Sequence, residues 1–266
     1  MILRIIYEPR GRALEYASLA VSLYRGCSHG CVYCFAPAST RTEREKFLHV
    51  QPRKDALKKL EADCKDLAAM GDQREILMSF TCDPYPQTER ELCLTRDAIE
   101  ILVKYGRKFT ILTKAGTWVT MDKDLYQGGS DLGRFGTTLT FWNNNDRQIW
   151  EPSAATTQDR MYNLWFMKDH GIRTWVSLEP VIYPEQTLEL IRQTVGYVDE
   201  YRIGKFNHTE GNKDLQEFIE KIGYHYPTDE EWREFVAKAY TLLKFYGKKF
   251  IFKRDLQPYL PGGNRT

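Results

Sequence analysis

The clearest signal in this chain is RGCSHGCVYCF at residues 25–35, which spaces Cys27, Cys31 and Cys34 as C-x3-C-x2-C. Cysteine thiolates are the ligands of iron–sulfur clusters. A cubane cluster has four irons, so three thiolates leave one iron with an open coordination position. A centre that binds and activates a ligand needs such an opening, as a catalytic zinc does. The spacing therefore predicts a catalytic [4Fe-4S] cluster.

The alternatives for these thiols are a structural zinc site and a chance grouping. Zinc would need a fourth ligand, and no second C-x2-C pair follows the loop. His29 could serve, but it lies inside the same tight loop. Gly26 and Gly30 would let the backbone bend around a cluster and present amide hydrogens to its sulfurs. An iron–sulfur cluster is therefore favoured.

The composition is that of an ordinary globular chain. Of 266 residues, 42% are hydrophobic and 28% are charged, and the net charge is +2. This charge gives no general argument for nucleic acid, although basic runs at residues 53–59 and 244–254 would permit a polyanionic substrate. No run of about 18 apolar residues is present, so no membrane span is expected. The charged N-terminus lacks a signal cleavage site, and we expect a cytoplasmic protein.

Short β-type runs alternate with helical patterns along the chain. Gly106 and Gly171 stand where two helices would end, and Thr228 is a candidate cap for the last helix. This alternation predicts βα units with a parallel sheet, and six or more units favour a barrel or partial barrel. No long polar linker divides them, so we expect one domain over residues 1–266. The expected strands are residues 19–24, 75–81, 108–113, 136–141, 174–178, 197–203 and 249–253, and the expected helices are residues 55–70, 89–105, 157–170, 184–195 and 228–246.

With an aromatic residue before its last cysteine, the C-x3-C-x-Y-C loop resembles the signature of the radical S-adenosylmethionine (SAM) superfamily. The resemblance implies an α/β fold, a partial (β/α)6 TIM-like barrel with its core at residues 15–205 and a C-terminal helical extension at 206–266. It also implies a [4Fe-4S] cluster, SAM and an external one-electron reductant of the flavodoxin or ferredoxin type. In that superfamily, SAM chelates the open iron and is reductively cleaved. The resulting 5′-deoxyadenosyl radical abstracts hydrogen from the substrate.

Further segments, in the expected order, are similar to the spore photoproduct lyase-like (DNA repair photolyase-like) branch of this superfamily. The founding member of that branch repairs a thymine dimer in DNA. The aromatic-rich C-terminal part matches nothing that the family assigns. The similar segments are LYRGCSHGC (23–31), SFTCDPY (79–85), TILTK (110–114), Glu151-Pro152 followed by Arg160, and VSLEPVI (176–182).

The resemblance assigns cofactor binding to residues at or just after expected strand ends, where a βα barrel places its chemistry. It places Tyr33 against the adenine of SAM and Lys114 on the SAM carboxylate. Thr140 would bond the ribose or amino group, Asp83 would line the pocket, and Glu179 continues the pattern. Three of these have a plainer interpretation: Lys114 as an exposed strand-end lysine, Thr140 as a sheet threonine, and Asp83 as a turn residue before proline.

The resemblance makes Cys82 a candidate hydrogen-atom donor. In spore photoproduct lyases, a cysteine in the second-strand loop donates a hydrogen atom to the product radical. That cysteine precedes the aspartate of the loop by a little more than Cys82 precedes Asp83. The alternative is a small apolar core residue, which free cysteine often is. Cys64 and Cys93 are interpreted as core or surface thiols, and Arg160 as a structural partner of Glu151.

Three functions remain open from the sequence. The first is a radical SAM enzyme acting on a thymine-like nucleobase, in DNA or as a nucleotide. The second keeps the cofactors but takes a small metabolite, a peptide or RNA. The third is an iron–sulfur electron-transfer or sensor protein, which would normally need a fourth cluster ligand that is not obvious here.

Overall fold

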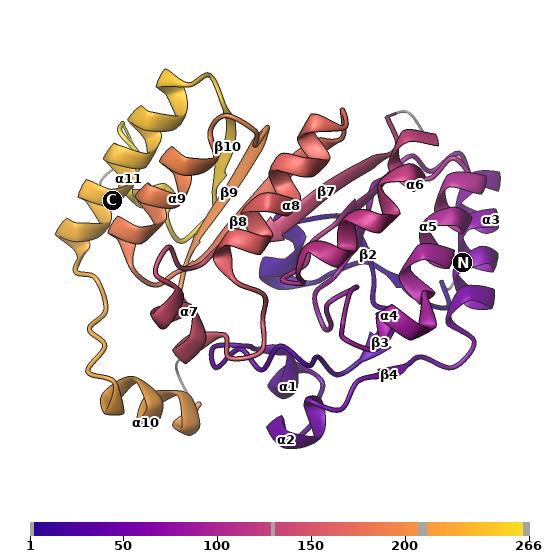
Figure 1. Cartoon of the computed structure of the whole chain (residues 1–266), viewed down its shortest axis with the longest axis horizontal. Coiled ribbons are helices and arrows are strands. Elements are labelled where there is room, and N and C mark those ends of the chain that lie inside the picture. Colours follow the sequence, from indigo (N-terminus) through magenta and orange to yellow (C-terminus); the bar gives the residue numbers. More distant parts are fainter. Residues whose placement is uncertain (1–2, 129–130, 207–211, 263–266) are drawn as a thin grey trace.

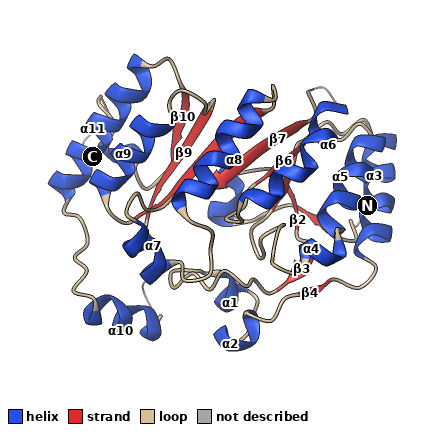
Figure 2. Cartoon of the chain, viewed as in Figure 1, coloured by secondary structure: helices blue, strands red, loops and turns tan. Residues whose placement is uncertain are grey.

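A computed structural model describes residues 3–128, 131–206 and 212–262. Its main feature is one sheet with the strand order β1-β2-β5-β6-β7-β8-β9-β10, parallel throughout except that β1 runs antiparallel to β2 (Figure 2). A small antiparallel sheet pairs β3 (Tyr24–Arg25) with β4 (Gln51–Pro52). The strands of the main sheet are β1 (Ile6–Tyr7), β2 (Leu19–Val21), β5 (Ile76–Met78), β6 (Phe109–Ile111), β7 (Gly133–Thr138), β8 (Arg173–Val181), β9 (Glu200–Lys205) and β10 (Lys249–Phe252).

The longer helices lie along the outer side of the sheet, from α3 at one end to α11 at the other (Figure 1). The helices α1 and α2 lie apart from them on the side of the small sheet, and α10 lies apart at the lower left of the view, below α7. The helices are α1 (Ala36–Ser39), α2 (Arg44–Phe47), α3 (Ala56–Ala69), α4 (Glu89–Leu92), α5 (Leu94–Lys104), α6 (Lys123–Gly128), α7 (Asn144–Trp150), α8 (Thr157–Asp169), α9 (Pro184–Thr194), α10 (Lys213–Lys221) and α11 (Asp229–Phe245), with 3-10 turns η1 (Gly11–Glu15), η2 (Thr117–Asp122) and η3 (Gln257–Tyr259).

All seven expected strands are present, with boundaries that differ by at most three residues. The expected cap of the last helix is also present, because Thr228 and Glu231 form a reciprocal capping box at the start of α11. The single helix expected over residues 89–105 is wrong: Cys93 adopts a left-handed conformation with φ of 48° and divides it into α4 and α5. Helices α7 and α10 were not expected from the sequence.

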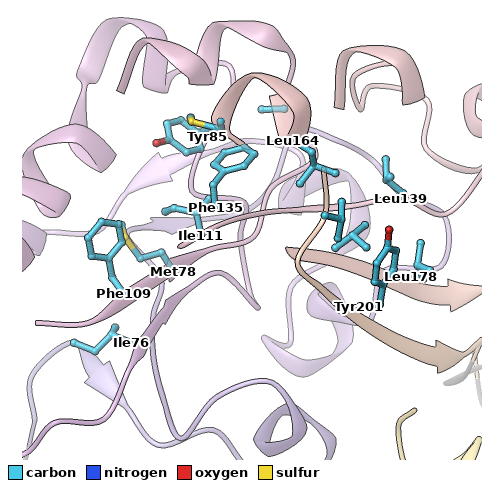
Figure 3. Close-up of a cluster of buried hydrophobic side chains, with 14 of the residues drawn as sticks. Ile76, Met78, Tyr85, Phe109, Ile111, Phe135, Leu139, Leu164, Leu178 and Tyr201 are labelled. Carbon is cyan, nitrogen blue, oxygen red and sulfur yellow. The ribbon is translucent and has the colours of Figure 1, made fainter. Parts of the chain in front are cut away.

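The core lies between the sheet and the outer helices (Figure 3). Alternate strand residues such as Ile76 and Met78 point into it, because successive side chains of a strand face opposite sides. These side chains are fully buried, and burial of each large apolar group contributes about 1.5–3 kcal/mol relative to exposure. The stabilised sheet holds the loops that follow its strands in fixed positions.

The interior of the barrel is filled by Trp175 from β8. Its indole N–H donates to the carbonyl oxygen of Ile111 at 3.1 Å, and the guanidinium of Arg202 lies 4.9 Å from the ring centroid. Gly136 is the register partner of Trp175 on β7, and a Cβ at Gly136 would lie only 2.2 Å from the indole nitrogen. The absence of a side chain at Gly136 therefore makes room for the ring that forms the barrel floor.

The barrel is partial, as expected, and η1 spans part of the opening between its edges. Arg12 of η1 bonds Asp255 at 2.5 Å, and the backbone N–H of Arg254 donates to Glu15 at 3.0 Å. The C-terminal region contributes strand β10 to the sheet as well as the helices α10 and α11. Among the described helices, none has the length and apolar character needed to cross a membrane.

Candidate active site

A cavity of about 480 Å³ lies at the carboxyl ends of the parallel strands. Its volume is within the usual range of about 300–1,000 Å³ for small-molecule sites. Residues from the first strand loop to the end of β10 line it, so it draws on most of the chain. Its chemically notable lining residues are Cys27, Cys31, Cys34, Cys82, Lys114 and Glu179.

The cysteine loop is held in a conformation that requires glycine at position 26. Gly26 has φ of 80°, and a Cβ there would lie 2.5 Å from the carbonyl oxygen of Phe47 and 2.7 Å from that of His49. The neighbouring N–H of Cys27 donates to the same Phe47 oxygen at 2.8 Å. Because only glycine tolerates this close approach at positive φ, the loop is pinned where the first thiol begins.

Arg44 of α2 fixes the other end of the loop. Its guanidinium donates to the carbonyl oxygens of Cys31 at 3.0 Å, Val32 at 2.9 Å and Cys34 at 3.3 Å. The N–H of Val32 donates to Trp150 of α7 at 2.9 Å. The loop is thus bound from both sides before any cofactor is added.

The donor set suits a cluster better than a single ion. Within the described ranges, no three His, Cys, Asp or Glu side chains converge as the ligands of one metal ion do. Three thiolates of a cubane each bind a different iron, so they need only face a common cavity, as Cys27, Cys31 and Cys34 do. Burial raises the pKa of Cys31 to about 12, although Lys114 opposes it. Iron binding must therefore displace protons from the loop.

Asp83 braces the cysteine loop against the strand loops. One carboxylate oxygen lies 2.9 Å from Nε2 of His29 and accepts the backbone N–H of Lys114 at 2.8 Å. The other accepts the Thr113 hydroxyl at 2.7 Å and the Tyr85 N–H at 2.8 Å. Burial acts to raise the pKa of Asp83, but the His29 ring and these hydrogen bonds outweigh it, so the pKa is lowered. Asp83 lines the cavity as expected, with both oxygens engaged by protein groups.

Lys114 is a cation at the cavity wall, at the carboxyl side of β6. Within the described residues, its ammonium group has no hydrogen-bond or ion-pair partner, and its nitrogen lies 5.7 Å from the ring centroid of Tyr33. Burial acts to lower its pKa, but the nearby Cys31 and Glu151 outweigh burial and raise it. A charged ammonium that faces a cavity without a carboxylate partner is suited to an anionic ligand group.

Tyr33 is fixed by a buried polar network. Its hydroxyl donates to Glu151 and lies 3.3 Å from the hydroxyl of Thr140. Glu151 also pairs with Arg160 at 2.5 Å, and both side chains are fully buried, as expected for a structural pair. Thr140 is buried beside Tyr33 and does not line the cavity. The structure therefore brings Tyr33 to the site with Thr140 beside it, and the contact of Thr140 with SAM stays a prediction.

Cys82 faces the cavity from the loop after β5. Its side chain is buried, and burial raises its pKa to about 11, so the thiol keeps its proton at neutral pH. The same loop contains Phe80 at φ of 87°, a conformation that is rare for a bulky residue and that is often found at functional sites. Cys64 is buried in the core and Cys93 is exposed, as the sequence suggested.

Glu179 lies on the wall formed by β8, β9 and β10. One oxygen accepts the hydroxyl of Tyr16 and the ammonium of Lys253, and the guanidinium of Arg12 lies 3.8 Å from the other. Tyr16, Lys253 and Arg12 were missed by sequence analysis. Lys253 is the last residue of the last expected strand, so its position at a strand end was the signal that could have found it.

Comparison with known proteins identifies the family that this geometry fits. The profile of the radical SAM superfamily matches residues 21–198. The chain belongs to this superfamily. Its cofactors are accordingly a [4Fe-4S] cluster and SAM, and the three loop thiols beside an unpaired lysine fit both groups.

Solved structures of two proteins with bound S-adenosylmethionine share the fold. A spore photoproduct lyase variant with bound AdoMet and dinucleoside spore photoproduct matches with a TM-score of 0.71 and 14% identity, over 94% of this chain and 78% of that one. SuiB of Streptococcus suis, bound to S-adenosylmethionine, matches with a TM-score of 0.64 and 12% identity, over 93% and 53%. These similarities confirm the partial barrel.

A curated relative covers most of both chains. The uncharacterized protein MJ0683 of Methanocaldococcus jannaschii is 24% identical over 217 residues, which is 81% of this chain and 79% of that protein. The similarity therefore extends over most of this chain.

Proposed function

We propose that this radical SAM enzyme acts on a thymine-like nucleobase, in DNA or in a nucleotide. The observation that carries the proposal is one cavity that joins the cysteine loop, the unpaired Lys114 and the protonated thiol of Cys82. Its fold is shared with spore photoproduct lyase, whose solved structures include a complex with dinucleoside spore photoproduct. A thiol that faces the cavity suits chemistry that must return a hydrogen atom to a carbon radical.

Each cofactor has a set of residues that would hold it. Cys27, Cys31 and Cys34 would bind the cluster, Lys114 would pair with the SAM carboxylate, and the ring of Tyr33 would pack against adenine. When bound, the cluster and SAM supply a 5′-deoxyadenosyl radical that abstracts hydrogen from the substrate. The chain's own task is to orient the reactants and to exclude water.

Aromatic side chains give the cavity a dry, planar lining. Phe35, Phe47, Phe80 and Phe206 all contribute to its wall. Aromatic rings stack on nucleobases, and each such contact is worth about 1–3 kcal/mol. These rings would both stack a base and protect a radical from solvent.

Cys82 would act in the last step of the reaction, as the donor of a hydrogen atom to the substrate radical. Transfer of its hydrogen atom breaks the S–H bond and forms a C–H bond on the substrate radical. The sulfur-centred radical left behind would regain an electron from the flavodoxin- or ferredoxin-type reductant and a proton from solvent.

We expect Cys82→Ala to cleave SAM but to change the product distribution, as resolved by chromatography. Cys93→Ala, which removes an exposed thiol, is the matched control, and unchanged products in Cys82→Ala would contradict the donor role.

The central experiment measures SAM cleavage with defined substrates. The protein is reconstituted anaerobically with iron and sulfide and then reduced, and 5′-deoxyadenosine is quantified with thymine-containing oligonucleotides, with oligonucleotides that contain only cytosine, and with none. We expect thymine to stimulate cleavage several-fold. Equal cleavage in all three cases would contradict the proposal. Stimulation by a peptide instead would favour the substrate class of SuiB, whose structure with the precursor peptide SuiA shares this fold.

A further inference from the structure

Glu179 offers an unused acceptor to the cavity. Its side chain is 17% exposed, and the described residues donate no hydrogen bond to Oε1, whereas Oε2 is bound by Tyr16 and Lys253. The guanidinium of Arg12 lies 3.8 Å from Oε1, too far for a hydrogen bond. A carboxylate oxygen and an N–H donor thus stand side by side, each with bonding capacity for a ligand.

Packing around the carboxylate holds it in place. A Cβ at Gly204 of β9 would lie 2.7 Å from Oε1 of Glu179, so the strand approaches as closely as a backbone can. Lys253 is 2% exposed, and its nitrogen lies 3.3 Å from the ring centroid of Tyr16. Arg12 is held from behind by Asp255 at 2.5 Å. Every group around the open oxygen is therefore fixed by a second contact.

The pair selects a particular ligand edge. Glu179 Oε1 accepts a hydrogen bond and Arg12 donates one, so their complement is an N–H group next to a C=O group. A cyclic imide such as thymine presents this edge at N3–H and C4=O. Cytosine presents an acceptor and an amine there, which reverses the pattern. The rings of Phe80 and Phe206 line the same cavity and would stack a planar base.

We propose that Arg12 and Glu179 recognise the imide edge of a thymine-like base, with Lys253 and Tyr16 as positioning residues. This inference rests on the proposed function and adds the residues that select the substrate. The competing ligand is SAM itself, whose ammonium and carboxylate groups would also suit Glu179 and Arg12. Among the described residues, Lys114 has no hydrogen-bond or ion-pair partner and lines the same cavity as the three loop thiols, so it would offer the SAM carboxylate a partner on that side.

The test compares the binding of five probes to the reconstituted holoenzyme with SAM. The probes are the dinucleotide TpT, its N3-methylthymine form and CpC, with thymidine monophosphate and a longer oligonucleotide added to separate a nucleotide from a DNA source. We expect the wild type to prefer TpT by about tenfold to a hundredfold. The preference should fall to nearly one in Glu179→Gln and Arg12→Gln, and Arg12→Lys should restore part of it.

Matched controls come from the exposed pair Glu189 and Arg192 on α9. Glu189→Gln and Arg192→Gln should keep the wild-type preference. A thermal melt and the iron content verify that each variant is folded and loaded, and Arg12→Gln keeps the test informative if Glu179→Gln does not fold. The SAM dissociation constant is measured for each variant without nucleic acid.

The outcomes separate this inference from the proposed function. Equal binding of TpT and its N3-methyl form by the wild type overturns the inference and leaves the proposed function standing. A weakening of SAM binding in Glu179→Gln that equals or exceeds the weakening of TpT binding assigns Glu179 to the cofactor and also overturns the inference. Failure of the wild type to bind any thymine probe overturns the proposed function, and the inference with it.

Discussion

The two sides of the cavity are built in different ways. On one side, the cysteine loop takes its three thiols from eight consecutive residues, 27–34, and it is pinned locally by Gly26 and Arg44. On the opposite side, Arg12, Glu179 and Lys253 come from the two ends and the middle of the chain. The first side, with Cys27, Cys31 and Cys34, is recognisable from its spacing in the sequence and is called the local side. The second, with Arg12, Glu179 and Lys253, exists only after the barrel has formed and is called the assembled side.

The two sides would have different roles, one in binding the cofactors and the other in binding the substrate. The side that resembles the superfamily would hold the cofactors, and its sequence would be constrained by the need for three bonds to one cluster. The assembled side depends on contacts between η1, β8 and β10, so its residues can differ without disturbing the cluster. A barrel of this kind can thus keep its radical generator and change its substrate.

The largest effect should come from the local side. Cys27→Ser removes one of three cluster ligands, so we expect loss of the iron–sulfur chromophore and a fall in 5′-deoxyadenosine formation of about a thousandfold or more, since removal of a catalytic group costs on this order. Iron content and visible absorption measure the first effect, and chromatography the second. Cys93→Ser is the control, because that thiol is exposed and lies outside the cavity. A fully loaded and active Cys27→Ser protein would refute the assignment of the cluster.

The next effect should come from Lys114, between the two sides. Lys114→Met removes the charge proposed to meet the SAM carboxylate, which should raise the SAM dissociation constant about tenfold to a hundredfold with the cluster intact. Equilibrium binding of SAM to the reconstituted protein measures this. Lys108→Met provides the control, because Lys108 is exposed at the amino side of the same strand. Equal SAM affinity in both variants would remove Lys114 from the cofactor site.

The barrel floor, formed by Trp175, should tolerate no methyl group added at Gly136. In Gly136→Ala the new Cβ would collide with Trp175, which should lower the free energy of unfolding by about 1–3 kcal/mol. Gly196→Ala is the control, since a Cβ at Gly196 meets no atom within 4 Å. Chemical denaturation distinguishes them, and equal stability of the two variants would show that the ring does not occupy this place.

A stability effect of similar size concerns the buried Glu89, which is hydrogen-bonded to the segment just before the cysteine loop. Tyr24, just before the cysteine loop, donates its hydroxyl to the buried Glu89, and burial raises the pKa of Glu89 to about 7 even though this hydrogen bond opposes the shift. Between its ordinary pKa of 4.5 and about 7, the folded chain holds a proton that the unfolded chain has lost. This stabilisation is complete at low pH and disappears as the pH rises through 7, by about 1–3 kcal/mol.

Glu89→Gln cannot titrate, so this part of the pH dependence should vanish. Denaturation at several pH values between 4.5 and 8 measures it, with the exposed Glu100→Gln as control. A wild-type stability that does not fall over this range relative to Glu89→Gln would contradict the raised pKa.

Strand positions and cofactor-side residues were accessible to sequence analysis for physical reasons. Strands such as β2 (LAV) and β5 (ILM) are short apolar runs that alternate with helical patterns, so all seven expected strands were found. The three cysteines proposed as cluster ligands are close together along the chain. The break at Cys93 was not predictable from helical periodicity, because the apolar pattern continues through it. Thr140 was placed on the cofactor from its position near a strand end, and only side-chain packing shows it bonded to Tyr33.

The sequence alone determined the radical SAM family, the parallel βα architecture and the three thiols, since each of these is written in local spacing or periodicity. Tertiary structure alone brought Arg12, Tyr16 and Lys253 to Glu179. Pairing of β10 with β9 brings Lys253 to Glu179 across 74 residues of the chain, and closure by η1 brings Tyr16 to it across 163 residues. No motif spacing in the sequence indicates that these residues lie together. The local side of this cavity, proposed to hold the cofactors, can therefore be recognised from the sequence. The assembled side, proposed to select the substrate, can be recognised only in the folded chain.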